Sequence, residues 1–341
     1  MKKKRIPMIV LGILLIFALI WWAGIEETLK LIVSANINYL LLALMMQLFA
    51  TFAWALRWQV FLRRAGVKIG FWRIIMATFI GVFFNNITPG ARAGGEPARM
   101  VVISKTSESK STYGQIFATI MADRILDVIP VMVFMFIAFK YALSLKVHVL
   151  LLVLSVSTLA LVAILTISIL LSLNEKLAMK SLKTIIMLLK RLFPRKFENI
   201  EEKLEDRLKR SIFEFRETLM ELSTDKAVLI KTLFYSFALW GFMILRTYFV
   251  FKSIDYPLEL YKILMVQMAG IALGMISIPP GGIGVTEAVN SALYLSLGIN
   301  KSLAVTATVI DRFISFWLPS IVGGALSIYL GVKGGGIKEK S

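Results

Sequence analysis

Long apolar runs, separated by short polar or basic breaks, dominate this chain. Several runs reach the roughly 20 residues that a helix needs to cross about 30 Å of hydrocarbon. The pattern therefore predicts an all-α polytopic membrane protein with about six full transmembrane helices and two re-entrant helical hairpins. The predicted full helices cover residues 8–24, 37–62, 114–139, 147–173, 228–251 and 302–331.

Two apolar segments are broken by Pro and Gly before they continue. Residues 71–88 lead into a second apolar piece at 97–104, which is too short to span a bilayer and ends in polar residues. Because that polar stretch must leave the membrane, we expect the two pieces to form a hairpin that returns to the side it entered from. Residues 258–279 and 284–297 predict a second hairpin.

The two halves of the chain carry one motif twice. In each copy a proline is followed, after glycines, by a glutamate, and an Asp-Arg pair and another proline come downstream. The first copy comprises Pro89, Gly90, Glu96, Asp123, Arg124 and Pro130. The second comprises Pro280, Gly281, Gly282, Glu287, Asp311, Arg312 and Pro319. A duplicated, interrupted hydrophobic segment indicates a substrate site near the bilayer midplane.

The repeat divides the chain into parts of one transmembrane domain, predicted over residues 1–341. These parts are a first helix, repeat one, a connecting helix, a segment with mixed charges and apolar residues at helical spacing, and repeat two. The mixed segment predicts a cytoplasmic amphipathic helix. The boundaries, in that order, are 8–24, 37–140, 147–173, 174–227 and 228–331.

Composition supports the membrane assignment and restricts the chemistry. The 341 residues are 58% hydrophobic, with a mean hydropathy of +0.78 and a net charge of +18. Because basic residues collect on the cytoplasmic side, this charge predicts cytoplasmic N- and C-termini in the cell membrane, and no nucleic-acid partner. The chain has no cysteine and a single histidine, His148, so we expect no thiolate chemistry, no metal site and no cofactor.

The same charge rule sets the orientation of the two copies. Copy one would enter from outside, with a hairpin that opens to the cytoplasm, and copy two would do the opposite. The repeats are therefore predicted to be inverted with respect to the membrane, as in many transporters.

Broken backbone at membrane depth survives only inside protein or beside a water-filled cavity. Pro removes a backbone donor and Gly permits a sharp turn, so we expect Pro89, Gly90, Pro280, Gly281 and Gly282 at the hairpin tips. The short helix after each tip would point its free N–H groups and partial positive charge inward, which suits a phosphate.

Charged groups at membrane depth are functional candidates, and arginine is suited to bidentate phosphate recognition. The predicted headgroup-binding residues are Arg92, Arg99, Arg124, Arg312, Asn85 and Asn86. The acids predicted to gate the site or form ion pairs are Glu96, Asp123, Glu287 and Asp311. Purely structural pairing is the alternative for these acids. Arg57 and Arg246 are expected to anchor their helices at the interface. Copy one is expected to form the headgroup pocket, and copy two the gate.

These motifs resemble a known family. The segments Thr88 to Arg99 and Pro280 to Glu287, together with Asp123-Arg124, look like the flippase-like integral membrane family. It corresponds to the transmembrane region of lysylphosphatidylglycerol synthases, the multiple peptide resistance factors. The resemblance covers about residues 8–331 and implies lipid translocation between leaflets. Because the chain stops at Ser341, we expect no soluble synthase domain and no lysine transfer.

The leading expectation is a non-enzymatic, flippase-like transporter that moves a phosphate-bearing lipid headgroup by alternating access at the hairpins. Its partner would be a membrane phospholipid or a polyprenyl-phosphate-type lipid, and a homo-oligomer is compatible with the sequence. The alternatives are a membrane enzyme acting on a lipid-linked substrate and a secondary transporter of small ions or solutes. The chain contains no phosphate-binding P-loop, so we do not expect transport to be driven directly by ATP. Passive scrambling and coupling to protons both remain open.

Overall fold

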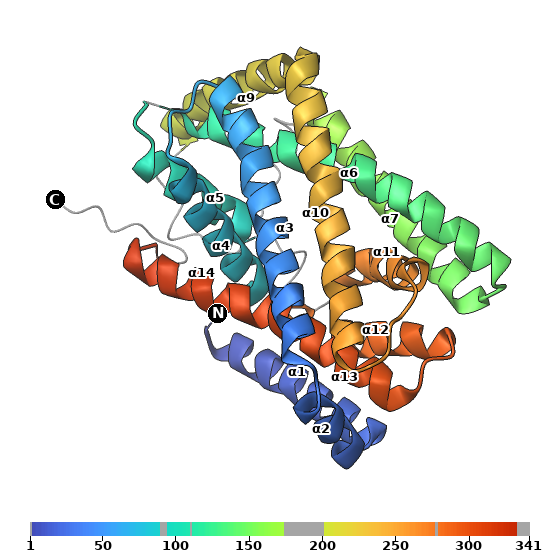
Figure 1. Ribbon diagram of the computed structural model, residues 1–341. Coiled ribbons are helices and arrows are strands. Elements are labelled where there is room, and N and C mark those ends of the chain that lie inside the picture. Colours follow the sequence, from blue (N-terminus) through green and yellow to red (C-terminus); the bar gives the residue numbers. More distant parts are fainter. Residues whose placement is uncertain (1, 89–93, 110, 174–200, 277–278, 333–341) are drawn as a thin grey trace.

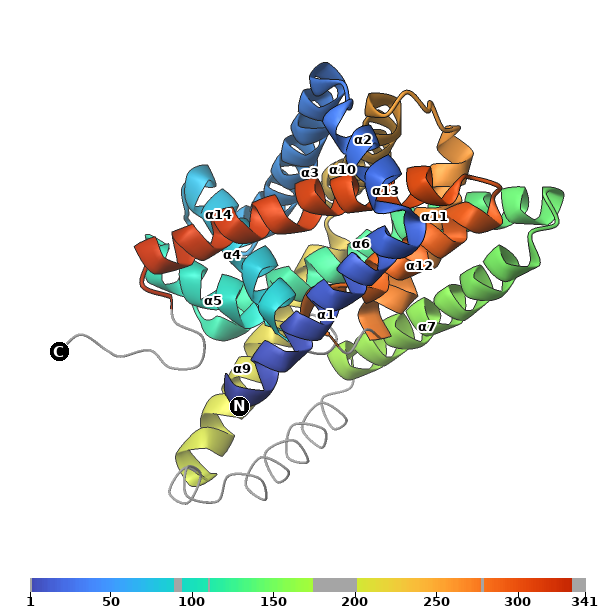
Figure 2. The same ribbon diagram turned by 90° about the horizontal axis from the view of Figure 1, so that it is seen from below.

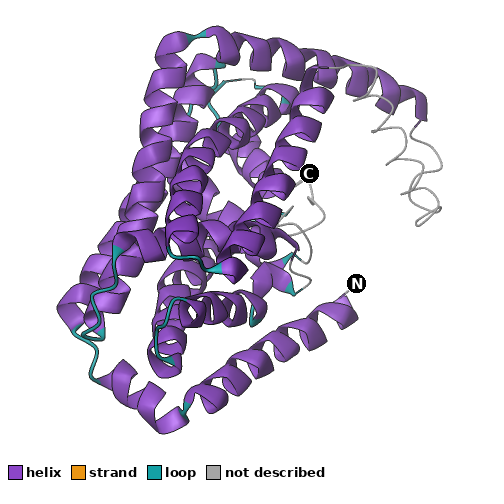
Figure 3. Ribbon diagram, turned by 90° about the vertical axis from the view of Figure 1, so that its right-hand side faces the viewer, coloured by secondary structure: helices purple, strands orange, loops and turns teal. Residues whose placement is uncertain are grey.

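A computed structural model describes residues 2–88, 94–109, 111–173, 201–276 and 279–332. Within these ranges the chain forms helices joined by short loops, and no strand (Figure 3). The protein is therefore an all-α polytopic membrane protein. The predicted first tip, with Pro89, Gly90 and Arg92, lies outside the described residues, as does 174–200 of the amphipathic segment.

Five described helices are long and apolar enough to cross a membrane, and a bent pair at the N-terminus makes a sixth candidate. The five spans contain α3 (Ile37–Arg64), α6 (Tyr113–Ser144), α7 (His148–Leu173), α10 (Lys226–Ser253) and the segment Lys301–Tyr329. The bent pair is α1 (Lys2–Ala23) and α2 (Ile25–Val33), whose axes differ by 97°. Gly24 makes this bend with a φ of 106°, a left-handed conformation that favours glycine.

Each predicted hairpin consists of one longer and one shorter helix. The first pairs α4 (Phe71–Ile87) with α5 (Gly95–Thr106), and the second pairs α11 (Leu260–Ile276) with α12 (Val285–Ser296). Both short helices have 12 residues. At 1.5 Å per residue they rise about 18 Å, which is less than the hydrocarbon thickness of about 30 Å. Neither short helix can span the membrane alone.

The two copies pack against each other reciprocally. Helices α3 and α10, the first of each copy, run side by side through the middle of the molecule (Figure 1). The hairpin helix α4 packs on α14 (Leu318–Tyr329) of copy two, as Figure 2 shows. In the same way, α11 of copy two packs on α6 of copy one. Each hairpin therefore rests on the last helix of the other copy.

The last span of copy two contains a π-helical turn, η3 (Phe313–Trp317), between α13 (Lys301–Arg312) and α14. Copy two has one residue more than copy one between its Asp-Arg pair and the following proline. A single inserted residue is accommodated in a helix as a π-bulge, and such bulges are frequent at functional sites. Copy one, in α6, passes through Pro130 without this extra residue.

The C-terminal end of α3 is tied to the junction between α9 (Glu201–Thr224) and α10. Asp225 caps α10 by accepting hydrogen bonds from the N–H groups of Ala227 and Val228, both at 3.1 Å. Arg64 Nε donates to Asp225 Oδ2 at 2.8 Å, and Arg64 also pairs with Glu221 of α9. The hydrogen bond from Arg64, together with these N–H groups, holds the pKa of Asp225 below its ordinary value of 3.8.

Gly323 lets α14 lie directly on α4, because a Cβ at this position would stand 2.1 Å from the backbone oxygen of Phe79. We expect Gly323→Ala to lower the stability by about 1–3 kcal/mol, because backbone must move to admit the methyl group. Gly324→Ala is the matched control, since its Cβ would meet only the Phe83 ring at 3.2 Å. Thermal unfolding in detergent measures both variants. Equal melting temperatures would contradict this packing.

Asp225 predicts an acid-sensitive junction. A carboxyl whose folded-state pKa is lowered contributes stability that is complete above pH 3.8 and is lost as the pH falls through the lowered value. Asp225→Asn keeps a good helix cap and removes the charge paired with Arg64. The protection factors for hydrogen exchange around the α9–α10 junction, which correct for the intrinsic pH dependence of exchange, should fall at low pH in the unmodified protein. In the variant we expect lower protection factors at neutral pH and a weaker pH dependence.

Candidate functional site

Arg57 is buried inside the molecule, in the C-terminal third of α3. Its side chain is 1% exposed and its Nε donates to Asp123 Oδ1 at 2.6 Å, while Nη1 pairs with Asp127, also on α6. Trp54 Nε1 donates to the other oxygen of Asp123 at 3.0 Å. A buried guanidinium needs such a full set of acceptors, because removing its charge from water is costly.

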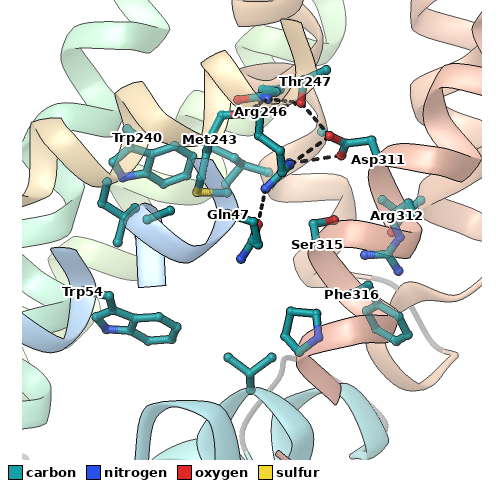
Figure 4. Close-up of a pocket in the computed structure, with 18 of the residues that line it drawn as sticks. Gln47, Trp54, Trp240, Met243, Arg246, Thr247, Asp311, Arg312, Ser315 and Phe316 are labelled. Carbon is teal, nitrogen blue, oxygen red and sulfur yellow. Dashed lines mark hydrogen bonds and ion pairs between the residues drawn. The ribbon is translucent and has the colours of Figure 1, made fainter. Parts of the chain in front are cut away.

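Arg246 on α10 makes the corresponding contacts in copy two. Its Nε and Nη2 donate to the two oxygens of Asp311 at 2.9 and 3.0 Å, a bidentate pair (Figure 4). Thr247 Oγ1 donates to Asp311 Oδ1 at 2.8 Å. The duplicated arginines and aspartates of the sequence therefore form duplicated ion pairs, Arg57 with Asp123 and Arg246 with Asp311.

Both arginines also reach into the other copy. Arg57 Nη1 donates to Ser236 Oγ on α10 at 2.7 Å, and Arg246 Nη1 donates to Gln47 Oε1 on α3 at 2.7 Å. Gln47 and Ser236 precede their respective arginines by the same number of residues, so they hold equivalent positions. The expectation that Arg57 and Arg246 anchor their helices at the interface is wrong. The two side chains connect the copies inside the protein.

A second duplicated pair joins each hairpin to the last helix of its own copy. Arg124 Nη2 donates to Glu96 Oε1 at 2.5 Å in copy one. Arg312 Nε donates to Glu287 Oε1 at 3.0 Å in copy two. The first pair is the more open, with Arg124 39% exposed, whereas Arg312 is 9% exposed. The structural pairing considered for the acids is thus present.

The second tip, η2 (Pro280–Gly282), is held tightly. Arg312 Nη2 donates to the carbonyl of Gly281 at 3.0 Å, and Glu287 Oε2 accepts the N–H of Gly284 at 2.8 Å. Gly281 has a φ of 59°, and a Cβ there would stand 2.3 Å from the Phe316 ring. The expected phosphate-binding N-terminus of α12 is therefore occupied by the protein's own carboxylate, with Glu287 acting as the reciprocal cap.

Arg99 lies behind the site rather than in it. The side chain is fully buried, with its Cζ 3.8 Å from the centre of the Trp58 ring, and its Nη2 is 3.4 Å from Asp123 Oδ2. It does not line the cavity described next. The headgroup contact predicted for Arg99 is corrected accordingly, because stacking on Trp58 directs the guanidinium toward Asp123.

A cavity of about 810 Å³ lies between the two copies. Trp54 and Trp240 lie on one side of it, and Arg312, Ser315 and Phe316 lie on the other (Figure 4). Its other wall residues are divided about evenly between polar or charged side chains and apolar ones. The predicted site residues that line the cavity are Asn85, Asn86, Glu96, Arg124, Asp311 and Arg312.

Four of the predicted polar residues also hold the structure around the cavity together. Asp123 and Glu287 are buried behind it and orient Arg57 and Arg312. Asn85 Oδ1 accepts the N–H of Gly95 at 2.7 Å and so caps α5, while Asn86 Nδ2 donates to Ser320 of copy two at 2.7 Å. Both copies supply polar residues to the cavity wall. The lining therefore does not support the hypothesis that copy one forms the pocket and copy two the gate.

Sequence reasoning missed several cavity residues. Gln47, Trp54, Gln267 and Asn290 all line the cavity, although none belongs to the duplicated motif. Asn290 follows Glu287 by about one helical turn, so this spacing carried a usable signal. The tryptophans carried none, because aromatic residues are also common in apolar helices.

These features define a helical, multi-pass membrane protein with duplicated intramembrane ion pairs around an internal cavity. The chain belongs to the family described as the lysylphosphatidylglycerol synthase TM region, whose model matches residues 9–323. The resemblance inferred from the motifs is confirmed.

Relatives of this length are archaeal membrane proteins. A UPF0104 membrane protein of Pyrococcus horikoshii is 46% identical over 323 residues, which is 95% of this chain and 96% of the relative. A UPF0104 membrane protein of Methanothermobacter thermautotrophicus is 29% identical over 97% of both chains. Another, of Methanocaldococcus jannaschii, is 25% identical over 94% of this chain and 93% of the relative.

The buried position of Arg57 predicts that lysine cannot replace it. Arg57→Lys keeps the charge but cannot donate from a fixed fork to Asp123, Asp127 and Ser236 together. We expect a loss of about 3 kcal/mol of stability, as for other broken buried ion pairs. Arg63→Lys, exposed near the end of the same helix, is the control and should be neutral. Equal thermal stability of both variants would contradict the buried role and would support the expectation that Arg57 anchors its helix at the membrane interface.

Proposed function

We propose that this protein is a lipid translocase, in which a phosphate-bearing headgroup passes through the cavity between the two copies while the tails stay in the bilayer. The single observation that carries the proposal is the pair of equivalent arginines, Arg124 and Arg312, in the wall of an intramembrane cavity. Charged groups at this depth normally face a substrate pathway.

Both arginines retain capacity to bind an anion. Among the described residues, Arg124 donates only from Nη2, to Glu96, and Arg312 leaves Nη1 without a partner. Each guanidinium also faces an aromatic ring: the Cζ of Arg124 is 5.5 Å from the centre of Trp54, and that of Arg312 is 4.2 Å from Phe316. A planar guanidinium held by one carboxylate and one ring keeps an edge free for phosphate oxygens.

The relation between the copies favours transport over a static binding role. If the repeats are inverted, as the charge distribution predicts, the first and second hairpins would open the cavity to opposite sides. The reciprocal packing of α4 on α14 and of α11 on α6 agrees with a two-fold relation of this kind. Under this proposal the protein sits in the cell membrane with cytoplasmic termini and moves lipid without chemical conversion.

Family membership supports a lipid cargo over a soluble one. The family is described as the lysylphosphatidylglycerol synthase TM region, and lysylphosphatidylglycerol is a phospholipid. A membrane enzyme that acts on a lipid-linked substrate is the second candidate. However, the carboxylates that line the cavity, Glu96, Asp127 and Asp311, are all bound to arginines. A carboxylate committed to an ion pair is poorly placed to act as a general base.

Translocation is measured with the full-length protein in liposomes that contain fluorescent phosphatidylglycerol, by chemical quenching of the outer leaflet. We expect quenching to pass well beyond the outer-leaflet half. The double variant Glu96→Gln/Arg124→Gln keeps local charge balance but removes the cation, so its initial rate should fall roughly tenfold or more. Glu287→Gln/Arg312→Gln tests the equivalent pair.

The control is Arg64→Gln/Glu221→Gln, which neutralises an exposed ion pair remote from the cavity. Its rate should match that of the unmodified protein, and circular dichroism should report the same helix content in all variants. Quenching that stops at the outer leaflet for phosphatidylglycerol and for a polyprenyl phosphate would reject the proposal. Product formation from a lipid-linked sugar would favour the enzyme, and uptake of a soluble solute the third alternative.

A further inference from the structure

The two halves of the cavity wall differ in chemistry. At four equivalent positions copy one has Gly95, Arg99, Ile120 and Asp127, whereas copy two has Thr286, Asn290, Thr308 and Ser315. All four residues of copy two line the cavity. Copy two therefore replaces charged and apolar side chains with neutral hydroxyl and amide groups on the cavity side.

Several of these neutral groups lack a hydrogen-bond partner. Thr286 Oγ1, Asn290 Oδ1, Thr308 Oγ1 and the Oε1 of Gln267 are buried and accept no hydrogen bond from any described residue. Thr308 is only 3% exposed. Buried polar atoms are usually paired, so a group of unpaired atoms on one cavity wall indicates a polar ligand. The two amide oxygens, Asn290 Oδ1 and Gln267 Oε1, can only accept, so this ligand must supply donors to them.

The orientation of Gln267 confirms that an acceptor faces the ligand. Its Nε2 donates to the carbonyl of Met243 at 3.2 Å and to Thr247 Oγ1 at 2.8 Å. A backbone carbonyl can only accept, so the amide nitrogen must lie on that side. The remaining oxygen, Oε1, is therefore an acceptor without a donor among the described residues.

The charged residues around the cavity indicate which kind of donor group the ligand carries. The five carboxylates around the cavity are each paired with an arginine, in the ion pairs Glu96–Arg124, Asp123–Arg57, Asp127–Arg57, Glu287–Arg312 and Asp311–Arg246. An ammonium group entering here would find no uncommitted carboxylate, and a buried unpaired cation is costly. Neutral hydroxyl groups supply donors without that cost.

We infer that the cavity recognises a phospholipid whose headgroup is a neutral polyol, such as glycerol, inositol or a sugar, joined through phosphate. The phosphate lies between Arg124 and Arg312, and the hydroxyls donate to the neutral acceptors of copy two. This inference rests on the proposed function and specifies its substrate class. It predicts discrimination against headgroups that end in an amine or in bare phosphate.

The test compares three lipids with identical tails: phosphatidylinositol, phosphatidic acid and phosphatidylethanolamine. Binding to the full-length protein in detergent is measured by native mass spectrometry, and translocation is measured in liposomes. We expect phosphatidylinositol to bind about tenfold more tightly than the other two, as two or more neutral hydrogen bonds would provide. Its translocation should also be the fastest.

Thr308→Val removes one acceptor and keeps the side-chain shape. It should weaken phosphatidylinositol binding roughly threefold to tenfold and leave phosphatidic acid binding unchanged. Thr306→Val is the matched control: Thr306 lies on the same helix and its Oγ1 is also buried without a partner, but it does not line the cavity. Because neither hydroxyl makes a hydrogen bond within the described chain, both variants should fold normally.

The outcomes separate this inference from the proposed function. Translocation with equal binding of all three lipids, or tightest binding of phosphatidylethanolamine, overturns the polyol inference and leaves the translocase standing. Selective binding of phosphatidylinositol that Thr308→Val reduces, without any translocation, supports the polyol site and rejects the translocase. A loss in Thr306→Val as large as that in Thr308→Val assigns the effect to packing and overturns the inference.

Discussion

Burying a guanidinium group is costly unless acceptors surround it, and in this molecule the acceptors of Arg57 and Arg246 hold the two halves of the chain together. Arg57 and Arg246 each bind an aspartate of their own copy and a polar side chain of the other copy. Helices α3 and α10 carry these arginines and lie side by side. The positions of α6 and α13 follow, because their aspartates must reach the same guanidinium groups at bonding distance.

The duplication supplies a symmetric scaffold, and the departures from symmetry supply the chemistry. Glu287 closes the second tip by accepting from Arg312 and from the backbone of Gly284, whereas Glu96 leaves Arg124 partly open to the cavity. Copy one adds the charged residues Arg99 and Asp127, and copy two has neutral groups in their place. Both copies contribute an arginine to the cavity wall, and copy two adds neutral hydrogen-bonding groups.

Paired charges suit a site that a lipid headgroup must enter and leave. The carboxylates hold the arginines in place when the cavity holds no anion, so a phosphate competes with an existing partner instead of meeting a bare cation. Such competition weakens binding and, in a carrier, favours release on the far side. The wall also contains apolar residues, including Phe79, Val82 and Leu239, which offer a headgroup no hydrogen bond.

The amino-acid sequence by itself determined the all-α membrane class, the helix positions within a few residues, the duplicated motif and the family, because these follow from hydrophobic run length and local spacing. Only the tertiary structure decided which charges pair, that Arg57 and Arg246 are buried and that Arg99 faces away from the cavity. These facts depend on contacts between residues far apart in the chain. Local patterns record that an arginine lies in an apolar helix, but the helices packed around it decide whether it meets lipid, a carboxylate or a ligand.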